Sequence, residues 1–159
     1  MNEDAEALFP IRADDRVNEY LDRPKALSVE DAKKFITIIN NNIAKDEVVY
    51  WAIILKDEQK LAGTICLWNI SVERNSAEIG FELHPDYQNR GIMQEAMSSV
   101  LRYGFDHMKL SLIEGFVHVG NARSLHLLTK NDFTPDPEME SKRKENPDLK
   151  DMVIYTRAK

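Results

Sequence analysis

Residues 77–133 constrain the fold more than any other stretch, because the spacing of their apolar residues changes several times. In residues 77–83 apolar side chains alternate with Glu and Gly, which is the period of a half-buried strand. The period then becomes 3.6 residues, so residues 90–107 predict an amphipathic helix. Residues 112–119 again have a strand pattern, and residues 121–130 predict a last helix. A strand, a helix and a strand in this order predict a parallel, right-handed crossover.

A glycine-bearing turn at residues 88–93 joins the first of these strands to its helix. Gly91 permits close approach of another group to the backbone. The first amides of a helix have no partners inside it and point outward, so such an end binds anions, phosphates in particular. An isolated glycine at a helix start is also typical of an ordinary turn, so the loop gains meaning only from its neighbours.

The loop resembles the pyrophosphate-binding loop of the GNAT superfamily of acyl-CoA-dependent N-acetyltransferases. The family pattern is Gln/Arg-x-x-Gly-x-Gly/Ala, which Gln88 and Gly91 match and from which Met93 departs. A larger residue at that place, together with the His-Pro-Asp-Tyr run at residues 84–87, resembles the branch of ribosomal-protein alanine and serine N-acetyltransferases.

A second motif follows at the spacing that the family has. Residues 121–133 are similar to the family's Asn-x-x-Ser/Ala helix that ends in Gly-Phe, with Asp132 in place of the glycine. We expect this change to be tolerated, because Asp visits the left-handed conformation at a helix end more readily than most residues. Asn121 is expected to cap the helix through its side chain.

The resemblance implies a single α/β domain over residues 1–159, with a mixed, mostly antiparallel central sheet, helices on both faces and splayed middle strands. Residues 47–55 and 61–69 predict a hairpin that fits such a sheet. The proline-containing, charged residues 134–150 predict an irregular excursion before the last strand.

Relatives of this kind begin with a strand before a Glu-Asp-Ala segment, whereas here that segment is residues 3–5. The first strand is therefore expected to be missing. Two explanations stay open: the sequence starts late, or a partner chain closes the sheet edge, as in a homodimer.

Composition limits the classes of function. A formal charge of −6 argues against a general nucleic-acid binder, which would show a basic face. The single cysteine, Cys66, cannot form an intramolecular disulfide and fits a reducing cytoplasm. No apolar run approaches the roughly 18 residues that span a membrane. The four histidines lack a metal-binding spacing, so no metal is expected.

By resemblance, the cosubstrate is acetyl-CoA, and its pantetheine arm enters the gap between the two middle strands. It is expected to pair with the backbone at Leu83 and to contact Asn121. Arg123 is a further candidate for its phosphates. The expected pyrophosphate contacts come from the loop residues Gln88, Asn89, Arg90, Gly91, Ile92 and Met93.

Acetyl transfer to an amine needs a base, and Glu78 and Glu82 lie four residues apart on one face of their strand. A carboxylate desolvated in the cleft would have a raised pKa, which suits a proton acceptor. Alternating glutamates also mark a solvated sheet face, so this second interpretation stays open. His118 is another candidate base, and relatives imply a carboxylate from the tail, here Glu138 or Glu140.

For the proton that the leaving thiolate needs, many family members supply a tyrosine seven residues after the asparagine. Leu128 stands there and cannot donate a proton. The branch resembled here offers Ser124 instead, so Ser124 is expected both to contact the cosubstrate and to serve as the acid.

The sequence therefore predicts an enzyme that transfers an acetyl group from acetyl-CoA directly to a primary amine, and the expected acceptor is the α-amino group of a protein or peptide. Two alternatives remain. One is a small-molecule acceptor, such as a polyamine or an amino sugar. The other is a CoA-binding or partner-binding module without catalysis.

Overall fold

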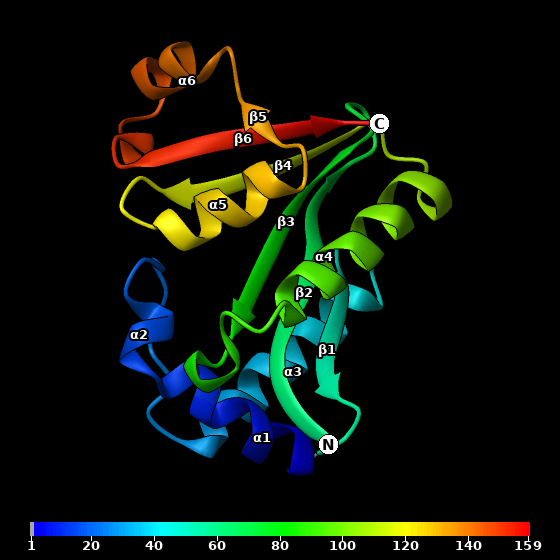
Figure 1. Ribbon diagram of the computed structural model, residues 1–159, viewed down its shortest axis with the longest axis vertical. Coiled ribbons are helices and arrows are strands. Elements are labelled where there is room, and N and C mark those ends of the chain that lie inside the picture. Colours follow the sequence, from blue (N-terminus) through cyan, green and yellow to red (C-terminus); the bar gives the residue numbers. More distant parts are fainter. Residues whose placement is uncertain (1) are drawn as a thin grey trace.

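The computed structural model describes residues 2–159, which fold around a six-stranded sheet (Figure 1). The strands are β1 (Val49–Leu55), β2 (Lys60–Ser71), β3 (Ser76–Leu83), β4 (Leu112–His118), β5 (Thr134–Pro135) and β6 (Met152–Ala158). They lie in the order β1-β2-β3-β4-β6-β5. Every neighbouring pair is antiparallel except β3 and β4, which are parallel. The predicted mixed, mostly antiparallel sheet is confirmed.

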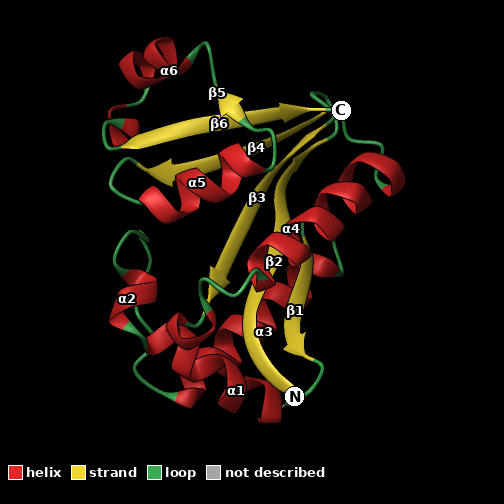
Figure 2. Cartoon of the chain, viewed as in Figure 1, coloured by secondary structure: helices red, strands yellow, loops and turns green. Residues whose placement is uncertain are grey.

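Helices lie on both faces of this sheet, as Figure 2 shows. The helices are α1 (Asn2–Ala13), α2 (Asp15–Asn18), α3 (Val29–Ile43), α4 (Ile92–Arg102), α5 (Ala122–Lys130) and α6 (Met139–Glu145). A π-helical turn, Tyr103–His107, continues α4, and short 3-10 turns lie at Pro85–Tyr87 and Pro147–Leu149. None of the helices in residues 2–159 is long and apolar enough to cross a membrane.

The core lies between the sheet and the pair α4 and α5. Its most buried side chains include Ile65, Leu67, Met97, Ile113 and Leu128, each at most 2% exposed. Glycine at position 115 of β4 lets α5 approach closely, because a Cβ there would lie 2.9 Å from Leu128 Cδ1. This close contact packs the C-terminal half of α5 against β4.

The first element of the described chain is a helix. Helix α1 begins at Asn2, and no strand precedes it within residues 2–159. Strand β1 pairs with β2 alone and forms one edge of the sheet.

Residues 134–150 differ from the predicted irregular excursion, because they contain β5 and α6. Ion pairs attach helix α6 to the sheet. Lys142 pairs with the buried Asp136, and its Nζ lies 3.9 Å from Glu114 Oε1 on β4. Arg74 lies 3.3 Å from the other oxygen of Glu114. The two ion pairs with Glu114 join distant parts of the sequence, so the local proline and charge content did not indicate them.

The C-terminal end of α5 forms as the sequence predicts. Asp132 has a left-handed φ of 62°. The Phe133 amide donates to the Leu128 carbonyl and the Asp132 amide donates to Thr129. This is the Schellman pattern, which satisfies carbonyls that the helix end leaves without partners.

Asp132→Gly should raise the free energy of unfolding by about 1 kcal/mol, because glycine adopts this backbone without a Cβ clash. The ion pair lost with Arg157, at 3.8 Å, contributes little because the Asp132 side chain is 84% exposed. Scanning calorimetry measures the difference. Asp132→Ala is the matched control and should lower the Tm, so a glycine variant no more stable than the alanine variant would contradict this explanation.

Candidate active site

Strands β3 and β4 pair at only three positions and then diverge. Residues 76–78 face residues 112–114, and the ladder ends there. Farther along, β3 remains paired with β2 as far as Leu83, and β4 remains paired with β6 as far as His118. Each strand is held by its outer neighbour, so the inner edges separate into the V that Figure 1 shows. The predicted splay of the middle strands is confirmed.

The space between the diverging strands is part of a cleft of about 1010 Å³. Both strands line it, together with the loop before α4, the first turn of α5 and the chain around α2. The cleft therefore brings together the two motifs that carry the resemblance. It also adds a wall, α2, that neither motif contains.

The loop before α4 presents free backbone amides to this cleft. Gly91 begins the helix with a left-handed φ of 77°, and no side chain caps the helix there. Within the described chain, the amides of residues 89–94 donate to no other group. A Cβ built on Gly91 would meet nothing within 4 Å, so the approach to these amides is open. This geometry fits an anion site at a helix N-terminus.

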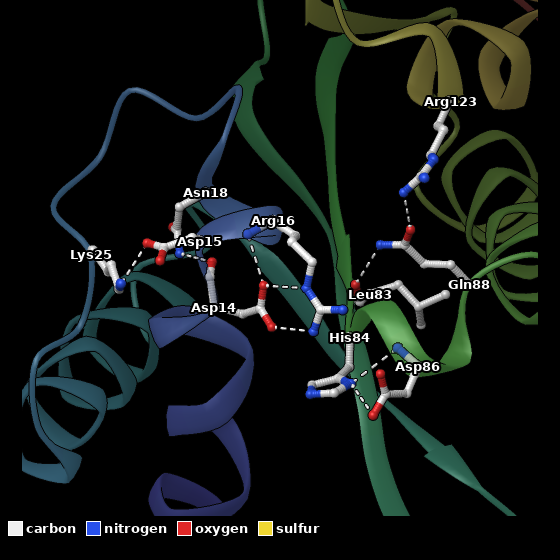
Figure 3. Close-up of polar contacts among 10 residues, drawn as sticks. All are labelled: Asp14, Asp15, Arg16, Asn18, Lys25, Leu83, His84, Asp86, Gln88 and Arg123. Carbon is white, nitrogen blue, oxygen red and sulfur yellow. Dashed lines mark hydrogen bonds and ion pairs between the residues drawn. The ribbon is translucent and has the colours of Figure 1, made fainter.

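Gln88 ties this loop to both walls of the cleft (Figure 3). Its Nε2 donates to the Leu83 carbonyl at 3.1 Å, and its Oε1 accepts from Arg123 Nη1 at 2.6 Å. Leu83, Gln88 and Arg123 all line the cleft. Arg123 thus lies beside the free amides and adds a positive charge to the same corner.

The remaining loop residues divide between the cleft and the surface. Asn89, with a left-handed φ of 60°, lines the cleft with Ile92 and the nearly buried Met93. Arg90 does not line it; its guanidinium lies 5.6 Å from the centre of the Tyr87 ring. Five of the six predicted loop residues therefore line the cleft, and Arg90 does not.

The first turn of α5 faces the same space. Asn121 Oδ1 accepts from the Ser124 amide at 3.1 Å, which confirms the predicted N-cap. Both side chains line the cleft. Within the described chain the Ser124 hydroxyl has no hydrogen-bond partner, so it is available to a ligand.

Glu78 and Glu82 both line the cleft, but their surroundings differ. Glu82 is 8% exposed, and both of its oxygens are occupied. Arg23 Nη2 lies 2.5 Å from Oε2, Thr64 Oγ1 donates to Oε1 at 3.1 Å, and Arg12 Nη1 lies 3.8 Å from Oε1. Two guanidinium groups therefore compensate this carboxylate.

Glu78, by contrast, has no ion-pair partner among the described residues. It lies opposite Glu114, at the point where the strands part. Burial raises the pKa of Glu78 to about 7; a hydrogen bond with Asn69 opposes the rise, and the negative charge of Glu114 adds to it. Near neutral pH this carboxyl can therefore both accept and release a proton.

His118 lines the cleft at the end of β4, but one of its ring nitrogens is already used. Nδ1 accepts from the Gly120 amide at 3.0 Å, so the neutral ring carries its proton on Nε2. Nε2 of the neutral ring can then donate a hydrogen bond. This arrangement favours a donor role over the predicted role as base.

Sequence reasoning missed two aromatic residues of the cleft. Trp68 of β2, 45% exposed, lies opposite Glu78, and Tyr20 packs on His118 with ring centroids 5.4 Å apart. Neither belongs to a motif, so no local signal marked it. Glu138 does not line the cleft, and the side chain of Glu140 lies outside the described part of the structure.

The raised pKa of Glu78 predicts a pH-dependent change in stability. The folded-state pKa of about 7 exceeds the unfolded value of about 4.3, so the contribution of this group is favourable at low pH and is lost as pH rises from roughly 4 to 7. Glu78→Gln should therefore stabilise the fold by about 2–3 kcal/mol above pH 7 and have little effect below about pH 4.

Denaturant unfolding at a series of pH values measures this difference. Glu73→Gln is the matched control, because Glu73 is exposed in the turn before β3, and the variant should follow the wild-type pH curve. A stability difference for Glu78→Gln that stays constant between pH 4 and pH 8 would contradict the assignment of a raised pKa.

Comparison with known proteins agrees with this geometry. A family model described as "Acetyltransferase (GNAT) domain" matches residues 1–134. The uncharacterized N-acetyltransferase YoaA of Bacillus subtilis is 29% identical over 155 residues, which cover 98% of this chain and 88% of that protein.

Two solved structures of acetyltransferases share the fold. A ribosomal-protein alanine acetyltransferase of Vibrio fischeri superposes with a TM-score of 0.77 at 18% identity, covering 99% of this chain and 88% of its own. A spermidine N-acetyltransferase of Vibrio cholerae, in complex with CoA and spermine, superposes with a TM-score of 0.80 at 16% identity, covering 99% and 91%. The chain belongs to the GNAT family of acetyltransferases.

Proposed function

We propose that this acetyltransferase moves an acetyl group from acetyl-CoA directly to the α-amino group of a protein or peptide. The family supports the reaction class. The choice of acceptor rests on the environment of Glu78, which lies where strands β3 and β4 part.

The residues around the cleft fit acetyl-CoA. The free amides of residues 89–93 and the Arg123 guanidinium would hold its diphosphate, since both are donors to anions. The inner edge of β3 near Leu83 and the side chain of Asn121 would hold the pantetheine arm between the strands. Acetyl-CoA supplies an acyl group that is activated as a thioester.

Glu78 is the proposed base. An α-ammonium group has a pKa of about 7.7–8.0, whereas that of an alkylammonium such as lysine is about 10.4. Transfer of a proton to a carboxylate with a pKa of about 7 therefore costs roughly 1 kcal/mol from the α-ammonium group. From the alkylammonium group it costs more than roughly 4 kcal/mol. The environment of Glu78 thus suits an α-amino acceptor better than a polyamine.

The proton for the leaving sulfur is assigned to Ser124. Ser124 lines the cleft next to Asn121, and its hydroxyl has no hydrogen-bond partner among the described residues. Leu128, at the place of the tyrosine in other family members, is completely buried in the core. Positioning contributes most of the rate under this proposal, and acid–base assistance contributes a smaller part.

Gly91→Glu should weaken acetyl-CoA binding at least about tenfold, because a carboxylate at the helix start competes with the phosphates for the same amides. The fold should survive, since open space surrounds this position. Calorimetric titration with acetyl-CoA measures the affinity. Gly91→Gln is the matched control, with the same size and backbone strain but no charge, and should bind more tightly than Gly91→Glu. An unchanged affinity in folded Gly91→Glu would place the phosphates elsewhere.

An acceptor panel tests the proposed substrate. Thiol release is followed with a free peptide, the same peptide with a blocked N-terminus, a polyamine and an amino sugar. The free peptide should react and the blocked peptide should not, and Glu78→Gln should lower kcat by about 10²–10⁴-fold. Faster thiol release with the polyamine or the amino sugar than with the free peptide would show that the acceptor is a small amine. Stabilisation by acetyl-CoA without thiol release from any amine would instead indicate a binding module.

A further inference from the structure

We propose that Glu82 is a positioning residue, which fixes the wall of the cleft formed by residues 15–22 (the α2 segment) to the floor strand β3. This inference rests on the proposed function, because it assigns the α2 segment to the acceptor. It gives Glu82 a role other than the base predicted from its position on the strand.

A chain of hydrogen bonds runs from the floor to the wall. Arg23 binds Glu82 through Nη2 at 2.5 Å and Asn18, the last residue of α2, through Nε at 3.0 Å. The Asn18 side chain in turn donates to the carbonyls of Arg12 and Asp14 at 2.9 and 2.8 Å. Figure 3 shows the bond between Asn18 and Asp14. Arg23 therefore connects β3 with the C-terminal end of α2.

The α2 segment needs this connection, because it has little packing of its own. Helix α2 has only four residues, and none of them is buried. Beyond it, Tyr20 packs on His118 of β4. The segment is thus attached to β3 through Glu82 and to β4 through His118, so it spans the two strands that form the cleft.

The charge of Glu82 also balances two neighbouring cations. Burial and the charge of Arg23 lower the pKa of Arg12, and Glu82 opposes this effect. Without the carboxylate, two part-buried guanidinium groups would repel each other at the base of the segment. Because both oxygens of Glu82 are engaged by this network, the carboxylate is committed to structure, whereas Glu78 has no such partners.

The position of the α2 segment matters for the acceptor. Coenzyme contacts are assigned to the loop before α4 and to α5, whereas Tyr20, Leu21 and Asp22 of the α2 segment also line this cleft and are left for the acceptor. A loosened segment should therefore weaken binding of the acceptor and leave binding of acetyl-CoA unchanged.

The test compares Glu82→Gln and Arg23→Gln with the control Lys25→Gln. Lys25 pairs with Asp15 at 2.5 Å on the exposed side of the same segment, and it does not touch Glu82. Arg23→Gln breaks the connection but keeps the pairing of Arg12 with Glu82, so it remains informative if Glu82→Gln does not fold. Amide hydrogen exchange and steady-state kinetics with a free peptide are measured for each variant.

Both test variants should show faster exchange in residues 15–22. They should also show a peptide KM raised by about ten- to a hundredfold, the range for loss of one hydrogen bond to a charged group. The KM for acetyl-CoA, the pH midpoint of kcat and the values for Lys25→Gln should stay near wild type. If Glu82 is instead the base, Glu82→Gln should show a large loss of kcat, and its kcat should no longer rise with pH. Arg23→Gln should then be much less affected.

Unchanged exchange in residues 15–22 of folded Arg23→Gln would overturn the proposal, as would a loss confined to kcat. If the wild-type protein acetylates no amine, the proposed function fails. The exchange measurement still decides in that case whether Glu82 holds the α2 segment.

Discussion

The early end of the β3–β4 ladder is the constraint on which the rest of the site depends. After three paired positions, each strand continues with its outer neighbour, and the inner hydrogen-bonding edges separate. A buried backbone edge without partners is costly, so such a gap persists where solvent or a ligand satisfies it. The gap also leads from the free amides before α4 to the carboxyl of Glu78. One break in the sheet therefore joins the proposed anion site to the proposed proton acceptor.

The two glutamates of β3 show how environment separates residues that the strand pattern treats alike. Glu78 and Glu82 are both glutamates on the same face of one strand. Glu82 meets Arg12 and Arg23, whereas Glu78 lies opposite Glu114 and has no ion-pair partner in the part of the chain that the structure describes. Cations compensate the first carboxylate, whereas burial raises the pKa of the second to about 7, so that Glu78 can exchange a proton near neutral pH. This difference explains why we assign chemistry to one and structure to the other.

Much of the fold could be predicted because its signals are local. The change of period at residues 77–107 identified the crossover, Asn121 the start of α5, and Asp132 its end. What the sequence could not indicate was long-range: Arg23 and Glu82 are far apart along the chain, as are Lys142 and Glu114. Helix α6 and the α2 wall depend on such pairs, so their placement required the structure. Trp68 and Tyr20 also line the cleft through the folding of distant parts of the chain, so the sequence did not indicate them.

Backbone amide NMR during a titration with coenzyme A tests the central claim most directly. The account predicts that the largest shifts fall on residues 89–94 and along the inner edges of β3 and β4, while the outer β1–β2 pairing stays unchanged. Shifts confined to other surfaces, or slow exchange of the β3 amides beyond Glu78 that face β4 rather than β2, would show that the two strands do not open to hold the cosubstrate.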